Sequence, residues 1–188
     1  LFDRITERLN VSKVIVDDLE GAYNAASYLI KKGRRRLAHI AGSPNLYVSQ
    51  KRRDGFKTAL HDKGHEVRHE YIINGGYHEE DGRAAAQQLC ALPEPPDGVF
   101  AINDPVALGA FSYFIDNNFK IPQDIALIGF SDNPNTTLVR PRLTTVSQPA
   151  FEMGETAAKL LLENLGKEDQ ELQPETVILK TQLVIRDS

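Results

Sequence analysis

Apolar residues follow two alternating patterns along the chain. Short continuous apolar runs, such as 99–102 and 126–128, alternate with longer segments in which apolar residues recur every three or four positions. The runs are typical of strands buried on both faces, and the longer segments are typical of amphipathic helices that end at residues such as Gly33 and Gly64. We expect strands at 14–16, 37–42, 71–73, 98–102, 125–130, 143–147 and within 176–185, and helices at about 19–32, 50–63, 79–92, 105–117 and 151–165.

This regular alternation of strand and helix predicts an α/β fold. Successive strand–helix–strand units form right-handed crossovers, which produce a parallel sheet with helices on both faces. Ligands of such sheets bind beyond the carboxyl ends of the strands. We therefore expect the functional residues to follow Gly42, Ile73, Ile102 and Phe130.

Polar side chains and one aromatic ring follow these four strand ends. They are Arg52 and Arg53, Tyr77, Asn103 and Asp104, and Ser131 and Asp132. Carboxylate, amide and guanidinium groups can hold hydroxyl groups in paired hydrogen bonds, and an aromatic ring can stack on an apolar face. The combination predicts a site for a polyhydroxylated or flat polar molecule.

Two of these assignments have structural alternatives. Asp104 precedes Pro105 and a helical apolar pattern, so it could simply be the N-cap of that helix. This role is compatible with ligand contact if the carboxylate also faces a cleft. Arg52 or Arg53 could equally be a solvated helix residue.

Composition and charge narrow the classes of function. The chain of 188 residues has 22 Lys and Arg against 26 Asp and Glu, a net charge of −4, which disfavours nucleic-acid binding by this segment. A single cysteine, Cys90, excludes an internal disulfide and predicts a buried, unreactive thiol. No apolar run approaches the ~20 residues of a membrane span, so we expect a cytoplasmic protein with no membrane partner.

Motifs for catalysis or cofactor binding are absent from the sequence. It has no glycine-rich dinucleotide or phosphate loop, no metalloprotease helix and no nucleophile elbow. Without a nucleophile beside its base, we expect no catalytic residue, no metal and no cofactor. A carbohydrate-processing enzyme that uses Asp104 and Asp132 as paired carboxylates is the weaker alternative.

Five segments, in order along the chain, resemble the LacI/GalR family of bacterial transcriptional regulators. They are residues 33–40 (GRRRLAHI), 99–110 (VFAINDPVALGA), 121–130 (IPQDIALIGF), 141–149 (PRLTTVSQP) and 153–158 (MGETAA). Each segment is weakly specific alone. Together they cover nearly the whole chain in the family's order, which makes the resemblance specific.

The resemblance implies the type I periplasmic-binding-protein-like fold, in which two lobes with parallel sheets flanked by helices are joined by three crossovers. On that pattern the first lobe is incomplete in this chain. Residues 1–16 and 149–178 would belong to the N-terminal subdomain, and residues 17–148 and 179–188 to the C-terminal subdomain. On the same pattern we expect the helix-turn-helix domain that family members carry at their N-terminus to be absent from this chain.

The resemblance also implies the effector-binding residues. They are Asp3, Arg4, Arg52, Tyr77, Asn103, Asp104, Ser131, Asp132 and Gln148. Arg52 matches an arginine that reaches into the effector cleft, and Tyr77 matches a ring that stacks on the ligand. Many relatives have Gly-Phe-Asp-Asn where this chain has residues 129–133 (GFSDN), so Ser131 takes the usual contact position and Asp132 remains an alternative.

The function implied is that of an effector-binding and dimerisation domain of a LacI-type regulator. Its allosteric effector would be a small molecule, expected to be a carbohydrate, and it would form a homodimer. Operator DNA would be bound through an N-terminal domain that is not in this chain. The alternative is a periplasmic sugar-binding receptor of a transport system, which has the same fold and would carry a signal peptide in place of a helix-turn-helix.

Overall fold

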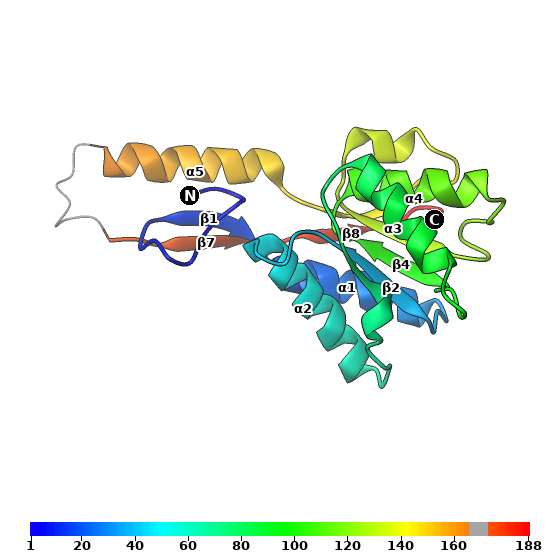
Figure 1. Cartoon of the computed structure of the whole chain (residues 1–188). Coiled ribbons are helices and arrows are strands. Elements are labelled where there is room, and N and C mark those ends of the chain that lie inside the picture. Colours follow the sequence, from blue (N-terminus) through cyan, green and yellow to red (C-terminus); the bar gives the residue numbers. More distant parts are fainter. Residues whose placement is uncertain (166–172) are drawn as a thin grey trace.

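The computed structural model describes residues 1–165 and 173–188 and places their strands in two sheets (Figure 1). One sheet has six strands in the order β3-β2-β4-β5-β6-β8, and the other pairs β1 with β7. The strands are β1 (Lys13–Val16), β2 (Leu37–Ala41), β3 (Ile72–Asn74), β4 (Gly98–Ala101), β5 (Ala126–Ser131), β6 (Thr144–Ser147), β7 (Thr176–Leu179) and β8 (Gln182–Val184). The helices are α1 (Asp18–Lys31), α2 (Tyr47–Asp62), α3 (Glu79–Cys90), α4 (Asp104–Asp116) and α5 (Ala150–Asn164).

The six-stranded sheet is parallel except for β8, which runs antiparallel to β6. Helices α1 and α2 pack on one face and α3 and α4 on the other. Neighbouring residues of one strand serve opposite faces: Val99 packs with α3 and α4, whereas Phe100 packs with α1 and α2. This burial on both faces confirms the α/β class expected from the continuous apolar runs.

Local sequence signals account for several helix ends. Gly33 and Gly64 adopt left-handed φ angles of 84° and 71° just after α1 and α2, a conformation that side chains with a Cβ avoid. Helix α3 begins with a capping box, in which His78 and Asp81 each bond the other's backbone. Gly109 lets α4 approach α3 closely, because a Cβ there would lie 1.8 Å from the carbonyl oxygen of Glu79.

The smaller sheet forms a second body with α5. Strand β1 pairs in parallel with β7, and Phe2 forms a bridge to Val14 on the other side of β1. Met153 of α5 packs on Val14 and Val16. Figure 1 shows this body beside the six-stranded one, with the N-terminus in the smaller body and the C-terminus in the larger.

In the described part of the chain, three crossovers join the two bodies, the number that the resemblance implied. The chain passes from β1 to α1, from β6 to α5 and from β7 to β8. Asp17 ties two of the crossovers together: its backbone N–H donates to Leu179 O at 3.0 Å, and its carboxylate accepts the Thr181 N–H at 2.7 Å. Lys180 adds an ion pair to the Asp17 carboxylate at 3.2 Å. The expected subdomain boundaries remain a prediction, and part of segment 149–178 lies outside the described residues.

Some element boundaries differ from the expectation. Helix α2 begins at Tyr47, three residues before the expected Gln50, and Val48 is buried in its first turn. Tyr71 belongs to a 3-10 turn and not to β3, because its buried hydroxyl donates to Glu94 O at 2.6 Å. The β-rich tail is divided between the two sheets, with the crossover at residues 180–181 between β7 and β8.

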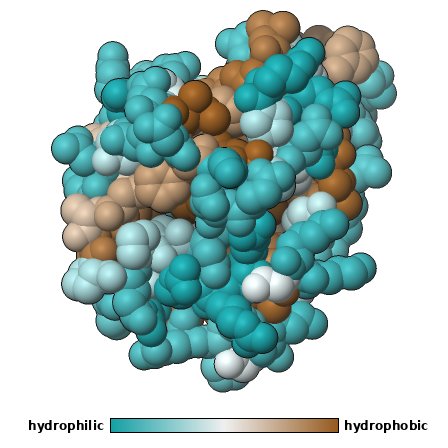
Figure 2. Space-filling view, turned by 90° about the vertical axis from the view of Figure 1, so that its right-hand side faces the viewer, coloured by the Kyte–Doolittle hydropathy of each residue, from teal (hydrophilic) through white to brown (hydrophobic). Residues whose placement is uncertain are grey.

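The surface of the larger body is mainly hydrophilic on the side turned away from the smaller sheet. Figure 2 shows that polar side chains cover most of this face, with smaller apolar areas between them. Among the described residues, no helix combines the length and the apolar character that crossing a bilayer would require.

His39, in the middle of β2, is a fully buried titratable group. Its ring stacks on Phe56 and Phe100, with centroid distances of 5.3 and 4.9 Å, and its Nδ1 hydrogen bonds to Phe100 O at 2.9 Å. Within residues 1–165 and 173–188, its Nε2 has no hydrogen-bond partner. Burial lowers the pKa of His39 to about 4, because a charged ring would lose its hydration.

Acid is therefore expected to destabilise the larger body through His39. The unfolded chain binds a proton near pH 6.5 and the folded chain only near 4, so stability should fall as the pH drops through this window, by about 3 kcal/mol in total. His39→Phe should remove this component while retaining the stacking. Urea unfolding of both proteins between pH 4 and pH 7 checks this, and parallel pH dependences would contradict it.

Candidate functional site

Arg52 joins the carboxyl ends of two strands of the larger sheet. From the second turn of α2, its Nη1 donates to Ile102 O, just after β4, at 2.6 Å. Its guanidinium carbon lies 3.5 Å from the ring centroid of Phe130, near the end of β5. The arginine that the resemblance singled out therefore lies at the edge of the sheet where a ligand was expected.

Asp18, in the first turn of α1, holds this guanidinium from the side. Nε of Arg52 donates to Oδ1 of Asp18 at 2.8 Å, and Nη2 forms an ion pair with the same oxygen at 2.8 Å. The two side chains are only 6% and 3% exposed. Burial raises the pKa of Asp18, although the Arg52 charge opposes that shift. Asp18 was not among the predicted site residues, because an acidic residue in the first turn of a helix is already favoured by the helix dipole.

Tyr77, in the loop after β3, contacts both bodies. Gly42 makes room for its ring, since a Cβ at residue 42 would lie 2.5 Å from the ring. The Tyr77 hydroxyl hydrogen bonds to Ser49 Oγ at 2.6 Å. From the N-terminal segment, the Arg4 guanidinium lies over the same ring, 5.1 Å from its centroid. The pair Arg4–Tyr77 is thus a cation–π contact between the two bodies.

Asn103, and not Asp104, caps α4. The Asn103 side-chain oxygen accepts the Val106 N–H at 2.9 Å, and its amide group donates to Tyr77 O at 3.0 Å. The alternative in which Asp104 is the N-cap is therefore wrong. Asn103 links the end of β4 to the loop that carries Tyr77.

Asp104 lies fully buried behind Asn103 and connects three segments. Its carboxylate accepts the Thr145 hydroxyl at 2.6 Å and the Asn133 N–H at 2.7 Å. Gly129 is required beside it, because a Cβ there would lie 2.1 Å from Asp104 Oδ1. Burial raises the pKa of Asp104, as expected for a carboxylate removed from water.

Ser131 and Asp132 have unusual backbone conformations at the end of β5. Their φ angles are 116° and 59°, a region in which non-glycine residues are strained by roughly 1–3 kcal/mol and which is frequent at binding sites. The Asp132 carboxylate pairs with Arg186 at 2.6 Å. Among the described residues the Ser131 hydroxyl forms no hydrogen bond, so it retains its capacity to donate and to accept.

The two remaining expected residues lie near the crossovers. Asp3 has a left-handed φ of 58° beside β1, where its N–H donates to Val14 O at 3.1 Å, and its charge helps to raise the pKa of Asp18. Gln148 follows β6 at the crossover to α5. Direct contacts connect Arg52 to the β4 and β5 ends, and Tyr77 to both Arg4 and Asn103. No side-chain contact in the described part of the chain joins Gln148 to them.

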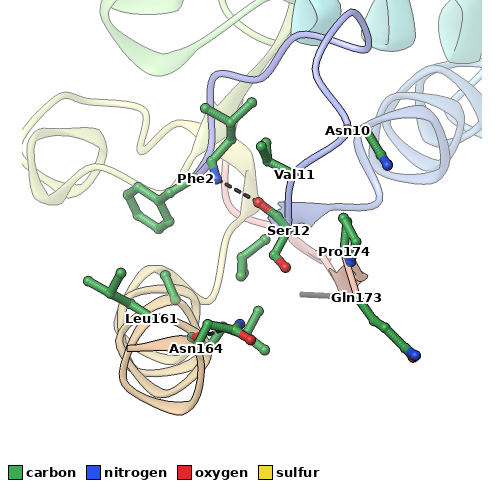
Figure 3. Close-up of a pocket in the computed structure, with 12 residues that line it drawn as sticks. Phe2, Asn10, Val11, Ser12, Leu161, Asn164, Gln173 and Pro174 are labelled. Carbon is green, nitrogen blue, oxygen red and sulfur yellow. Dashed lines mark hydrogen bonds between the residues drawn. The ribbon is translucent and has the colours of Figure 1, made fainter. Parts of the chain in front are cut away.

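A separate cavity of about 400 Å³ lies in the smaller body, between the N-terminal segment, β1 and α5 (Figure 3). Apolar side chains dominate its wall, including Phe2, Val11 and Leu161. The hydrogen bond drawn in Figure 3 joins the amino group of Leu1 to Ser12 O at 2.6 Å. This lining lacks the convergent polar groups that a polyhydroxylated ligand needs, so we do not place the effector there.

Metal and thiol chemistry find no support in the geometry. Within residues 1–165 and 173–188, no group of three or more His, Cys, Asp and Glu side chains is placed to hold a metal ion. Cys90 is half-buried at the end of α3, and burial raises the pKa of its thiol, which disfavours the reactive thiolate.

The sequence matches the periplasmic binding protein-like domain family over residues 26–188. The chain therefore belongs to this domain family. It is 32% identical, over its full length, to the probable HTH-type transcriptional repressor ExuR of Bacillus subtilis, of which it covers 56%. It is 36% identical, over 96% of its length, to the HTH-type transcriptional repressor CytR of Escherichia coli, of which it covers 52%. The chain thus spans about half the length of the curated relatives it matches.

Solved structures of LacI-type regulators have the same fold. The complex of the transcriptional regulator CelR with cellobiose matches with a TM-score of 0.89 and 30% identity, over 95% of this chain and 54% of that one. A LacI family regulator from Enterococcus faecium with bound ribose matches with a TM-score of 0.83 and 29% identity, over 94% and 65%. These findings confirm the LacI/GalR resemblance and the fold class. The relatives are repressors, not enzymes, and they favour a regulator over a periplasmic receptor.

The contacts of Asp104 predict a large effect on stability. Asp104→Ala leaves the Asn133 N–H and the Thr145 hydroxyl without their buried acceptor, which should lower the free energy of unfolding by about 2–4 kcal/mol. Asp116→Ala, which removes only an exposed ion pair with Arg83, should cost less than about 1 kcal/mol. Urea denaturation of both variants measures this. Equal, small losses would show that the Asp104 bonds contribute little.

Proposed function

We propose that this chain is the effector-binding and dimerisation domain of a LacI-type transcriptional regulator that is controlled by a small sugar. The observation that carries the proposal is the cluster formed by Arg52, Tyr77 and Asn103 at the carboxyl ends of the parallel strands. The relatives that bear HTH-type names support DNA binding by an N-terminal domain of a longer protein, acting in the cytoplasm. The sugar complexes of CelR and the E. faecium regulator support a carbohydrate effector.

The groups at this edge have the chemistry to hold a sugar. Hydrogen bonds to Asp18 and Ile102 use one N–H donor on Nε and one on Nη1 of Arg52, which leaves N–H donors on both Nη atoms for ligand hydroxyls. The Tyr77 ring can stack on the apolar C–H face of a sugar, and the Ser131 hydroxyl can donate or accept. We propose as residues of the effector site the full expected set, Asp3, Arg4, Arg52, Tyr77, Asn103, Asp104, Ser131, Asp132 and Gln148.

Within this set the roles differ. Arg52, Tyr77 and Ser131 would touch the ligand directly, because each retains hydrogen-bonding or stacking capacity. Asp104 would act mainly by holding neighbouring backbone in place, since both of its oxygens are already bonded inside the protein. Asp132, paired with Arg186, would likewise position the Ser131 loop.

Control would follow from contacts on both bodies. A ligand between Arg4 on the smaller body and Tyr77 on the larger one would favour one relative orientation. The ligand shifts the equilibrium between two orientations of the bodies only by the difference in its affinity for them, typically about 1–3 kcal/mol of coupling free energy. The crossovers that Asp17 connects would serve as the hinge.

The subdomain division and the dimer belong to the same proposal. We assign residues 1–16 and 149–178 to the N-terminal subdomain and residues 17–148 and 179–188 to the C-terminal one. The apolar cavity of Figure 3 supports this division of the chain. Relatives of about twice the length could contain a larger first lobe, and such a lobe would cover the apolar wall of the cavity. A homodimer would present two DNA-reading modules to the two halves of an operator.

A thermal-shift screen of neutral sugars tests the proposed site. A bound sugar should raise the melting temperature, because a ligand present at ~100 times its Kd stabilises the folded state by about 2.7 kcal/mol. Tyr77→Ala should abolish the shift by removing the stacking surface.

Tyr28→Ala is the matched control, because Tyr28 is also a half-buried tyrosine. It lies near the C-terminal end of α1, the end away from Asp18, and contacts Lys32. This variant should retain the sugar-induced shift. A screen without any stabilising sugar would contradict the proposed function, and a full shift in Tyr77→Ala would contradict the site.

A further inference from the structure

The ionised side chains at the strand ends of the larger body are arranged so that its cations are neutralised. Arg52 is paired with Asp18 and Arg186 with Asp132, at 2.8 and 2.6 Å. Asp104 adds a further carboxyl group whose partners, a hydroxyl and a backbone N–H, are neutral. The charge that this edge presents to a ligand is therefore zero or negative.

The contacts of the Asp18–Arg52 pair allow it to remain intact when a ligand binds. The carboxylate occupies the Nε–Nη2 edge of the guanidinium, Ile102 O takes an Nη1 hydrogen, and Phe130 covers one face of the group. Both side chains are almost fully buried, so water screens their charges poorly. A ligand reaching the free N–H groups of Arg52 therefore meets a dipole and not a net positive charge.

We propose that Asp18 is the residue that determines effector charge at this site, selecting uncharged polyhydroxylated molecules over anionic ones. The inference rests on the proposed function and specifies its ligand class. A hydroxyl group accepts hydrogen bonds from Arg52 without needing a net charge on the protein. A carboxylate or phosphate gains attraction from Arg52 but meets repulsion from Asp18, which lies at hydrogen-bonding distance from the same guanidinium.

The opposite body brings one charge of each sign to this edge, Arg4 and Asp3. Arg4 lies over the Tyr77 ring, and the sequence places Asp3 directly before it. The negative charge of Asp3 contributes to raising the pKa of Asp18, as expected for a nearby carboxylate. Removing the Asp18 charge should therefore convert Arg52 into an anion-binding group.

The test compares the protein with Asp18→Asn, which keeps the shape and the acceptor oxygen of the side chain but removes its charge. The probes are two neutral sugars, cellobiose and ribose, any further neutral sugar found in the thermal screen, and the matching aldonic acids. Calorimetry should show at least tenfold tighter binding of a neutral sugar than of its acid by the unchanged protein. This preference should fall at least tenfold in Asp18→Asn.

A second measurement uses sulfate as an anionic probe and does not require the effector to be known. Millimolar sulfate, at constant ionic strength, should raise the melting temperature of Asp18→Asn more than that of the unchanged protein. Asp54→Asn is the matched control, because it removes an exposed carboxylate from the same helix as Arg52, and it should behave like the unchanged protein. Circular dichroism verifies folding, and Asp18→Ser replaces Asp18→Asn if the latter does not fold.

The outcomes separate this inference from the proposed function. If no sugar binds any variant, the proposed function fails. The comparison of sulfate stabilisation between Asp18→Asn and the unchanged protein then tests by itself whether Asp18 neutralises Arg52. If sugars bind but the acids bind the unchanged protein as tightly as the neutral forms, the inference is overturned. It is also overturned if Asp18→Asn leaves both the sugar preference and the sulfate response unchanged.

Discussion

The buried ion pair between Asp18 and Arg52 is the interaction on which the rest of the site depends. It connects the start of α1 to α2, and through Arg52 it reaches the ends of β4 and β5. Removing two charges from water is costly, and such a pair is tolerated only when hydrogen bonds and packing are nearly complete. Here Asp18, Ile102 O and the Phe130 ring meet that condition. The guanidinium consequently has a defined orientation before any ligand arrives, which lowers the entropic cost of binding.

Small residues at the strand ends make this arrangement possible. Gly42 leaves space for the Tyr77 ring, and Gly129 leaves space for the Asp104 carboxylate. Asp104 then connects the start of α4 to Thr145 in β6 and to the loop after β5. The strained backbone at Ser131 is retained within this bonded framework. The larger body thus forms a rigid frame, and the Arg4–Tyr77 cation–π contact joins it to the smaller body. This arrangement suits a site whose ligand changes the relative orientation of the two bodies.

The fold could be predicted from the sequence because burial on both sheet faces imposes a periodicity that is visible residue by residue. The continuous runs at β4 and β5 and the glycines after α1 and α2 are local signals, and these elements lie where they were expected. The exceptions depend on distant contacts. Tyr71 lies outside β3, and its hydroxyl donates to Glu94 O. The C-terminal tail is divided between the two sheets at a crossover for which the local sequence pattern gives no signal.

The site was predictable only in part. The family resemblance proposed Arg52, Tyr77 and the Asn103–Asp104 pair as site residues, and these remain a prediction. It did not show how Asn103 and Asp104 divide their tasks, because both are plausible helix caps. Asp18 could not be found from spacing, since 34 positions separate it from the arginine it neutralises. The apolar cavity beside α5 depends on segments from both ends of the chain, so no local pattern indicates it.

A crystal structure of the protein with a bound neutral sugar would test the central claim most directly. The account predicts ligand hydroxyls at hydrogen-bonding distance from the Nη atoms of Arg52, with the Asp18 carboxylate still attached to the other edge of the guanidinium and the Tyr77 ring against the sugar. A sugar seated in the apolar cavity between β1 and α5, or one bound at the strand ends without touching Arg52, would contradict it.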